Sequence, residues 1–223
     1  MTQRAAPVVA VLGGSFDPVH HGHVALASLF QRLLAPDQLR VIPAGNPWQK
    51  KGLKASPEHR VAMLRLAFDE AGLDVVIDRQ EIERNAATYA IDTLRNIRSE
   101  LGPGASIVFL MGADQLQHLD SWRDWRALFD YTHFAVAARP GYALDELPPA
   151  VQAEVAARLG TAEDLCNSPS GRILIAPDLA IDISATGVRE SLAARGAPHG
   201  NEANSLISGV VLDYIQQHHL YNK

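Results

Sequence analysis

The sequence predicts an α/β fold, a Rossmann-like parallel sheet with helices on both faces. Short apolar runs alternate with amphipathic segments along the whole chain, which is typical of strands joined by right-handed helical crossovers. The runs are continuous in apolar residues, as strands buried on both faces usually are. Because 223 residues can bury a full core, we expect a single domain over 1–223, with a peripheral insertion near 143–170.

The expected elements follow in chain order. Six apolar runs predict strands at 8–12, 38–43, 74–78, 106–111, 132–138 and 172–175. Amphipathic or capped segments predict helices over 24–34, from Ser56 past Phe68, around Ile91 to Ile97, near 150–159, and from 182 to about 194. A closing helix is expected to carry Leu206, Val210, Tyr214 and Ile215 on one face.

Composition excludes several classes of protein. The net charge of −5, from 20 basic and 25 acidic side chains, argues against a general nucleic-acid surface. No apolar run approaches the ~20 residues of a membrane helix, and the start lacks the apolar segment of a signal peptide. Cys166 is the single cysteine, which excludes an internal disulfide and fits a reducing cytoplasm. We therefore expect a cytoplasmic protein without nucleic-acid, membrane or protein-bound metal partners; the oligomeric state stays open.

The stretch 13–23, Gly-Gly-Ser-Phe-Asp-Pro-Val-His-His-Gly-His, lies between the first strand and the first helix. Its glycines let backbone N–H groups approach a ligand, and a helix N-terminus favours anions. His20 and His23 are three residues apart, so both rings can lie near that end and donate hydrogen bonds to phosphate oxygens. The alternative is a tight glycine turn with surface histidines. The two histidines together favour a phosphate site.

A second phosphate-binding pattern lies near the other end of the chain. Ile183, Ser184, Thr186 and Arg189 stand at the start of a predicted helix. Hydroxyl groups, free backbone N–H groups and an arginine at one helix end suit phosphate. On the residues alone, an ordinary capped helix start with a solvated arginine explains them equally well.

These two stretches resemble the two signatures of the nucleotidylyltransferase superfamily, His-x-Gly-His and Ile-Ser-x-Thr-x-x-Arg, in the right order. The middle of the chain and its end resemble the bacterial nicotinate-nucleotide adenylyltransferases. The segments that carry this second resemblance are 84–89, 112–114, 121–122, 139–142 and 214–221.

The resemblance implies transfer of the adenylyl group of ATP to nicotinate mononucleotide, with release of pyrophosphate, in NAD biosynthesis, and with Mg²⁺ delivered by ATP. It implies catalytic roles for His20, His23 and Arg189. The ATP-binding residues implied are Gly13, Gly14, Ser15, Phe16, Gly112, Asp114, Ile183 and Ser184. The residues implied for the second substrate are Lys50, Thr88, Tyr89, Ala90, Trp122, Arg123 and Arg139.

The chain departs from the family pattern at three places. Gln49 precedes Lys50 where a histidine is usual, Ala90 replaces a threonine, and Arg123 replaces an aromatic residue. Any contact of Ala90 with a carboxylate must therefore use its backbone N–H. We hypothesise that Arg123 partly replaces the lost polar contact to the nicotinate carboxylate.

Two kinds of alternative stay open at this point. The acceptor can be another phosphomonoester, such as nicotinamide mononucleotide or phosphopantetheine, or the enzyme can be a cytidylyltransferase. The chain can also be a nucleotide-binding module without catalysis. Retention of His20, His23 and Arg189 together argues against this last interpretation.

Overall fold

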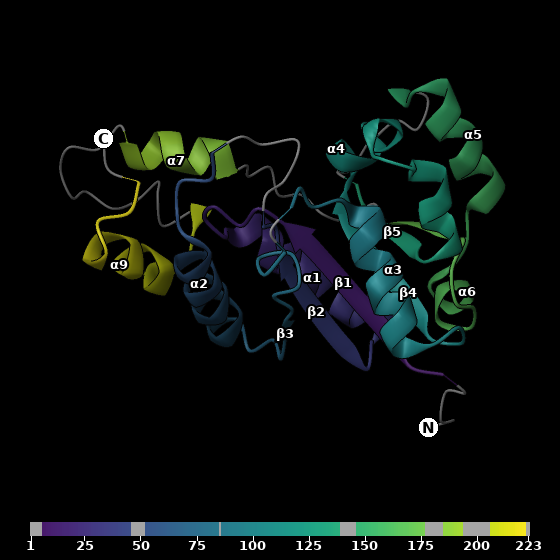
Figure 1. Ribbon diagram of the computed structural model, residues 1–223, viewed down its shortest axis with the longest axis horizontal. Coiled ribbons are helices and arrows are strands. Elements are labelled where there is room, and N and C mark those ends of the chain that lie inside the picture. Colours follow the sequence, from purple (N-terminus) through teal and green to yellow (C-terminus); the bar gives the residue numbers. More distant parts are fainter. Residues whose placement is uncertain are drawn as a thin grey trace.

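The computed structural model describes residues 6–45, 52–84, 86–138, 146–176, 185–193 and 206–221. Within them the strands form a parallel sheet in the order β3-β2-β1-β4-β5-β6 (Figure 1). The strands are β1 (Val8–Gly14), β2 (Gln38–Pro43), β3 (Val76–Ile77), β4 (Ser106–Gly112), β5 (His133–Ala137) and β6 (Ile173–Ala176). Because all five pairings are parallel, the carboxyl ends of the strands share one edge. The predicted fold class is confirmed.

The strand order places a topological switch point between β1 and β4. From β1 the chain adds β2 and then β3 on one side, whereas β4, β5 and β6 extend the sheet on the other side. The connections after β1 and β4 therefore leave in opposite directions, and open α/β sheets bind ligands in the crevice expected at this carboxyl edge.

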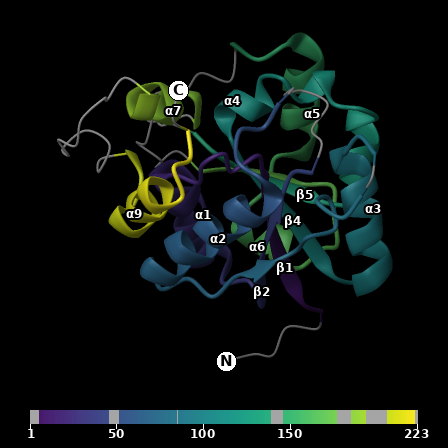
Figure 2. The same ribbon diagram turned by 60° about the vertical axis from the view of Figure 1, so that its left-hand side comes forward.

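Helices cover both faces of the sheet, as expected (Figure 2). One hydrophobic cluster packs under α1 (His21–Leu34), α2 (Pro57–Glu70), α6 (Ala162–Cys166), α7 (Ala185–Ala193) and α9 (Gly209–Gln217). The other packs under α3 (Ala90–Leu101), α4 (Ala113–Leu116), the 3₁₀ turns η1 (Leu119–Ser121) and η2 (Trp125–Asp130), and α5 (Pro149–Arg158). No helix among the described residues is long and apolar enough to span a bilayer.

Two details of the expected elements were wrong. The third strand is limited to Val76 and Ile77, the two residues that pair with β2 at the edge of the sheet. On α9 the core-facing residues are Val211 and Ile215, four apart on one side of the helix, whereas Val210 is 38 % exposed. Leu206 precedes that helix.

A buried histidine joins β5 to the segment before β6. His133 is fully buried; its Nε2 lies 2.8 Å from the carbonyl oxygen of Ser168, and its Nδ1 accepts the backbone N–H of Arg172 at 3.0 Å. This pair of bonds requires the neutral ring with its proton on Nε2. Burial, assisted by the charges of Arg98 and Arg172, lowers the pKa of His133 to about 4.

This histidine makes stability depend on pH. An unfolded histidine binds its proton near pH 6.5, whereas the folded one does so only near 4, so the unfolded state holds more protons between these values. The contribution of the neutral His133 to the free energy of unfolding is complete above about pH 6.5. It falls as the pH approaches 4, by about 3 kcal/mol in total. In urea titrations between pH 7.5 and 5, we expect the free energy of unfolding of His133→Gln to fall less steeply with decreasing pH than that of the wild type. The exposed His118→Gln serves as control, and a slope in His133→Gln equal to that of the wild type contradicts the prediction.

Candidate active site

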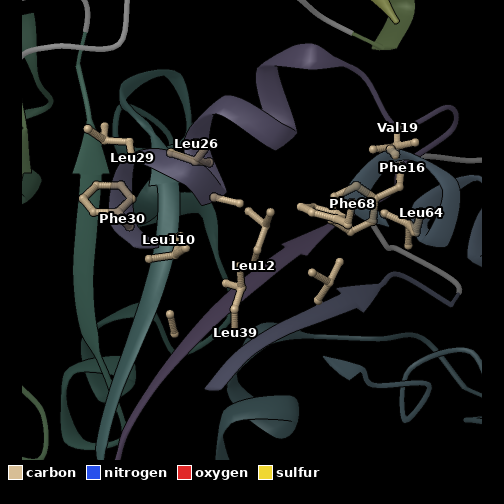
Figure 3. Packing of buried hydrophobic residues seen from close by; sticks show 14 of the residues in the cluster. Leu12, Phe16, Val19, Leu26, Leu29, Phe30, Leu39, Leu64, Phe68 and Leu110 are labelled. Carbon is tan, nitrogen blue, oxygen red and sulfur yellow. The ribbon is translucent and has the colours of Figure 1, made fainter. Parts of the chain in front are cut away.

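The turn 13–23 is anchored in the core by aromatic packing. Figure 3 shows Phe16 and Val19 of the turn beside Leu64 and Phe68 of α2. Phe16 is fully buried and has a φ of 46°, a left-handed backbone that bulky residues rarely adopt. Its burial compensates for this conformation, so the path of the turn depends on the packing of one ring.

The two glycines of the turn make room for rings. A Cβ atom on Gly14 would lie 3.0 Å from the ring of Phe16, and one on Gly13 would lie 3.1 Å from the ring of Phe109. Both distances are tighter than ordinary contacts. The glycines therefore allow the aromatic side chains to pack against the end of β1. This role differs from the close approach to a ligand that the sequence pattern predicts for them.

The two histidines of the turn lie in contact. His20, at the N-cap of α1, is 7 % exposed, and its ring stacks on that of His23 with centroids 3.6 Å apart. The backbone N–H of His20 donates to Nδ1 of His23 at 3.2 Å. We therefore assign the neutral His23 tautomer with its proton on Nε2, which presents an N–H donor suited to a phosphate oxygen.

Asp17 joins four segments of the chain. Its carboxylate accepts the backbone N–H groups of Lys54 at 2.7 Å and Ala55 at 3.0 Å, and the hydroxyl of Tyr221 at 2.7 Å. Its own carbonyl oxygen accepts Nη1 of Arg189 at 2.6 Å. Asp17 is 2 % exposed, so these donors replace the water that the carboxylate loses on folding.

The last of these bonds brings the two sequence motifs together. Arg189 extends from α7 to the turn that carries His20 and His23, and its Nη2 also contacts Oγ1 of Thr186 at 3.2 Å. Figure 1 shows α7 along the edge at which β1 ends. Four predicted site residues lie outside the described residues, and they are Lys50, Arg139, Ile183 and Ser184.

A second arginine supports the same turn from inside the core. Arg60 of α2 is fully buried, and its Nη1 donates to the carbonyl oxygen of Ser15 at 2.8 Å. Burial lowers the pKa of Arg60, and the nearby Asp17 opposes that shift. Arg60 was not among the predicted site residues, although it shares a helix face with Leu64 and Phe68 at spacings of four and eight.

Across the switch point, β4 ends beside an exposed carboxylate. A Cβ atom on Gly112 would lie 2.5 Å from Oδ1 of Asp114, so the absence of a side chain at Gly112 leaves room for this carboxylate. The other oxygen of Asp114 accepts Nε2 of Gln115 at 2.9 Å. An exposed carboxylate in this crevice is a suitable acceptor for ribose hydroxyl groups.

An aromatic cluster, which we call the aromatic wall, lies where the start of α3 meets the segment after η1. Trp122 packs edge-on against Phe109 with centroids 5.8 Å apart, and its buried Nε1 has no hydrogen-bond partner among the described residues. The guanidinium of Arg123 lies 4.8 Å from the centre of the Tyr89 ring. Thr88, next to Tyr89, is 4 % exposed. An unpaired indole donor beside a cation suits a planar, negatively charged ligand.

A partly buried carboxylate lies near this wall. Burial raises the pKa of Glu81, while a hydrogen bond from Oγ1 of Thr93 at 2.7 Å opposes the shift. A Cβ atom on Gly45 would collide with the carbonyl oxygen of Glu81, so the chain after β2 lies directly against this segment.

Known proteins place the chain in a family. Residues 11–191 match the family model described as cytidylyltransferase-like. A relative from Herminiimonas arsenicoxydans, named a probable nicotinate-nucleotide adenylyltransferase, is 57 % identical over 215 residues, covering 96 % of each chain. One from Laribacter hongkongensis with the same name is 44 % identical, covering 99 % of this chain and 97 % of its own.

Solved structures agree on the fold. A Plasmodium falciparum nicotinic acid mononucleotide adenylyltransferase complexed with NaAD has a TM-score of 0.71 at 20 % identity, covering 96 % of this chain and 97 % of its own. Together with the identities above, which run over nearly the whole chain, this agreement confirms the resemblance of the motifs: the chain belongs to the nicotinate-nucleotide adenylyltransferase family.

Proposed function

We propose that the chain transfers the adenylyl group of ATP to nicotinate mononucleotide, giving nicotinate adenine dinucleotide and pyrophosphate in NAD biosynthesis. The bond from Arg189 to the carbonyl oxygen of Asp17 carries the proposal, because it joins two phosphate-binding helix starts at one crevice. The names of the relatives support it. Because ATP and NAD are cytoplasmic metabolites, we expect a cytoplasmic enzyme.

The reaction needs little acid–base chemistry from the protein. The 5′-phosphate of the acceptor is largely ionised near pH 7, because its second pKa is ~6, and one of its oxygens attacks the α-phosphorus of ATP. The bond from that phosphorus to the bridging oxygen breaks, and pyrophosphate leaves. The protein brings two anions together and neutralises the charge that develops.

The site residues divide along the triphosphate. We assign His20 and His23 to the α- and β-phosphates, and Arg189 with Ser184 to the leaving pyrophosphate. The backbone of Gly13, Gly14, Ser15 and Phe16 lines the phosphates. Gly112 and Asp114 hold the ribose, and Ile183 contacts the adenine.

Mg²⁺ belongs to the substrate in this proposal. The imidazole and guanidinium groups assigned to the triphosphate suit phosphate oxygens, whereas Mg²⁺ prefers oxygen ligands. The phosphate oxygens of ATP therefore hold the ion, and it neutralises part of their charge.

The aromatic wall binds the pyridine nucleotide. Trp122 stacks on the pyridine ring, and the backbone of Thr88, Tyr89 and Ala90 meets the nicotinate carboxylate. Arg123, which lies against the Tyr89 ring, adds a positive charge at this end. Lys50 and Arg139 complete the proposed set for this substrate.

A pyrophosphate-release assay with a panel of acceptors tests the function. We expect nicotinate mononucleotide to give a kcat/KM at least about tenfold above that of nicotinamide mononucleotide. The carboxylate that distinguishes nicotinate from nicotinamide pairs with charged and N–H donors of the protein. Phosphopantetheine should give no turnover. Preference for phosphopantetheine, or the absence of turnover with every acceptor, contradicts the proposal.

His20→Ala tests the phosphate site. Loss of one transition-state donor typically costs ~3–4 kcal/mol, so kcat should fall at least about a hundredfold while the fold survives. The neighbouring His21→Ala is the matched control and should keep kcat within about threefold of the wild type. Near-normal turnover in His20→Ala, measured with nicotinate mononucleotide, removes His20 from this role.

Arg123→Ala tests the recognition of the carboxylate. We expect KM for nicotinate mononucleotide to rise about fivefold with kcat little changed, because a charged contact to the ground-state ligand is lost. Arg126, whose guanidinium lies 4.3 Å from the centre of the Trp125 ring, offers the control Arg126→Ala with no expected change. An unchanged KM in Arg123→Ala rules the hypothesis out.

A further inference from the structure

We propose that Tyr221 is a positioning residue for adenylyl transfer: its hydroxyl, bound to Asp17, holds the turn 13–23 in the conformation that aligns its histidines with Arg189. This inference rests on the proposed function and assigns Tyr221 a role beyond the nucleotide-binding residues.

The hydroxyl of Tyr221 donates to Oδ1 of Asp17 at 2.7 Å, across 204 residues of sequence. Burial, assisted by the hydrogen bond and the charge of Asp17, raises the pKa of Tyr221, so the phenol keeps its proton and remains a donor. Asp17 is 2 % exposed, so no bulk solvent replaces a lost donor. The contact is therefore part of a closed polar cluster.

Asp17 transmits this contact to both phosphate motifs. Its carbonyl oxygen is bound by Arg189, and its peptide lies three residues before His20. A shift of the Asp17 side chain therefore moves the attachment point of the arginine and the start of α1 together. A misplacement of about 1 Å at reacting groups is enough to slow chemistry strongly.

The backbone before Tyr221 is specialised for this contact. His219 has a φ of 51° and Tyr221 a φ of 62°, so two residues with side chains adopt left-handed backbone after α9 ends at Gln217. Such conformations persist only where surrounding contacts determine them, and they are common at functional sites. Here they direct the phenol ring toward the buried carboxylate.

A tyrosine on the preceding helix offers a matched comparison. Tyr214 of α9 also bonds through its hydroxyl, which lies 2.9 Å from Nδ1 of His59 on α2. This bond joins α9 to α2 and does not reach the turn. Tyr214→Phe and Tyr221→Phe therefore remove the same atom at positions seven residues apart, and they differ in whether Asp17 loses a donor.

Steady-state kinetics with ATP and nicotinate mononucleotide compare the two variants, well below their thermal midpoints. We expect Tyr221→Phe to lower kcat about tenfold with KM for nicotinate mononucleotide within about twofold, and Tyr214→Phe to leave both within about twofold. A purely structural contact would lower the thermal midpoint without this change in kcat. Equal kcat values in the two variants overturn the proposal.

A double-mutant cycle tests the route through Asp17. In Asp17→Asn, the amide NH2 group replaces one carboxylate oxygen and faces a group that donates a hydrogen bond to Asp17 in the wild type. That bond is lost, and we expect kcat to fall about tenfold, as in Tyr221→Phe. Adding Tyr221→Phe should lower kcat by no more than about a further twofold, because both changes break one network. If the loss of kcat in the double variant equals the product of the two single losses, the proposal is overturned. If Tyr221→Phe does not fold, Asp17→Asn decides: kcat within about twofold of the wild type overturns it.

Binding separates this proposal from the proposed function. If the wild type gives no turnover with any acceptor, the function fails, and calorimetry with a non-hydrolysable ATP analogue then tests Tyr221. Tyr221→Phe should bind the analogue at least about threefold more weakly than Tyr214→Phe, because the phosphate turn is displaced. Equal affinities overturn the positioning role.

Discussion

The site depends on one buried carboxylate. Asp17 accepts two backbone N–H groups and a phenol through its side chain, and an arginine through its carbonyl oxygen. A carboxylate removed from water is stable only when such donors surround it, and losing one of them costs more than the bond contributes when formed. Three segments far apart in the sequence are therefore obliged to meet the turn after β1. The crevice is shaped by the hydrogen-bonding requirement of Asp17, while the sheet fixes its location.

The core and the site share atoms along this turn. Phe16 belongs to the hydrophobic cluster under α1 and α2 (Figure 3). The carbonyl oxygen of its neighbour Ser15 accepts a hydrogen bond from the buried Arg60. Packing determines where the ring lies, and the ring determines the backbone path that leads to His20. Because close-packed interiors resist displacement, this arrangement holds the proposed phosphate donors in place before any nucleotide binds, which is the preorganisation that charge stabilisation requires.

Local patterns predicted the sheet and pointed to the two motifs proposed to bind phosphate, since both depend on neighbours in sequence. The run 38–43 gave a strand with its observed bounds, and Ser56 is the observed N-cap of α2. Adjacent valines at 210 and 211 left the buried face of α9 undetermined, because either one completes an apolar stripe. The contact of Tyr221 with Asp17 spans 204 positions, and no periodicity encodes a bond at that separation. Arg60 was missed because an arginine on a helix is ordinarily solvated, and only the packed core reveals it as buried.

A carboxylate beneath a proposed triphosphate site would repel its ligand if it stood alone. Arg60 and Arg189 both approach the same turn, so two guanidinium charges oppose the single charge of Asp17. Around this turn the two guanidinium charges therefore exceed the charge of Asp17, although the chain as a whole carries −5. Charge falls off over about 10 Å in salt, so the nearest groups decide what an anion experiences. Asp17 thus orders the backbone by its hydrogen bonds, while the two arginines leave the site attractive to phosphate.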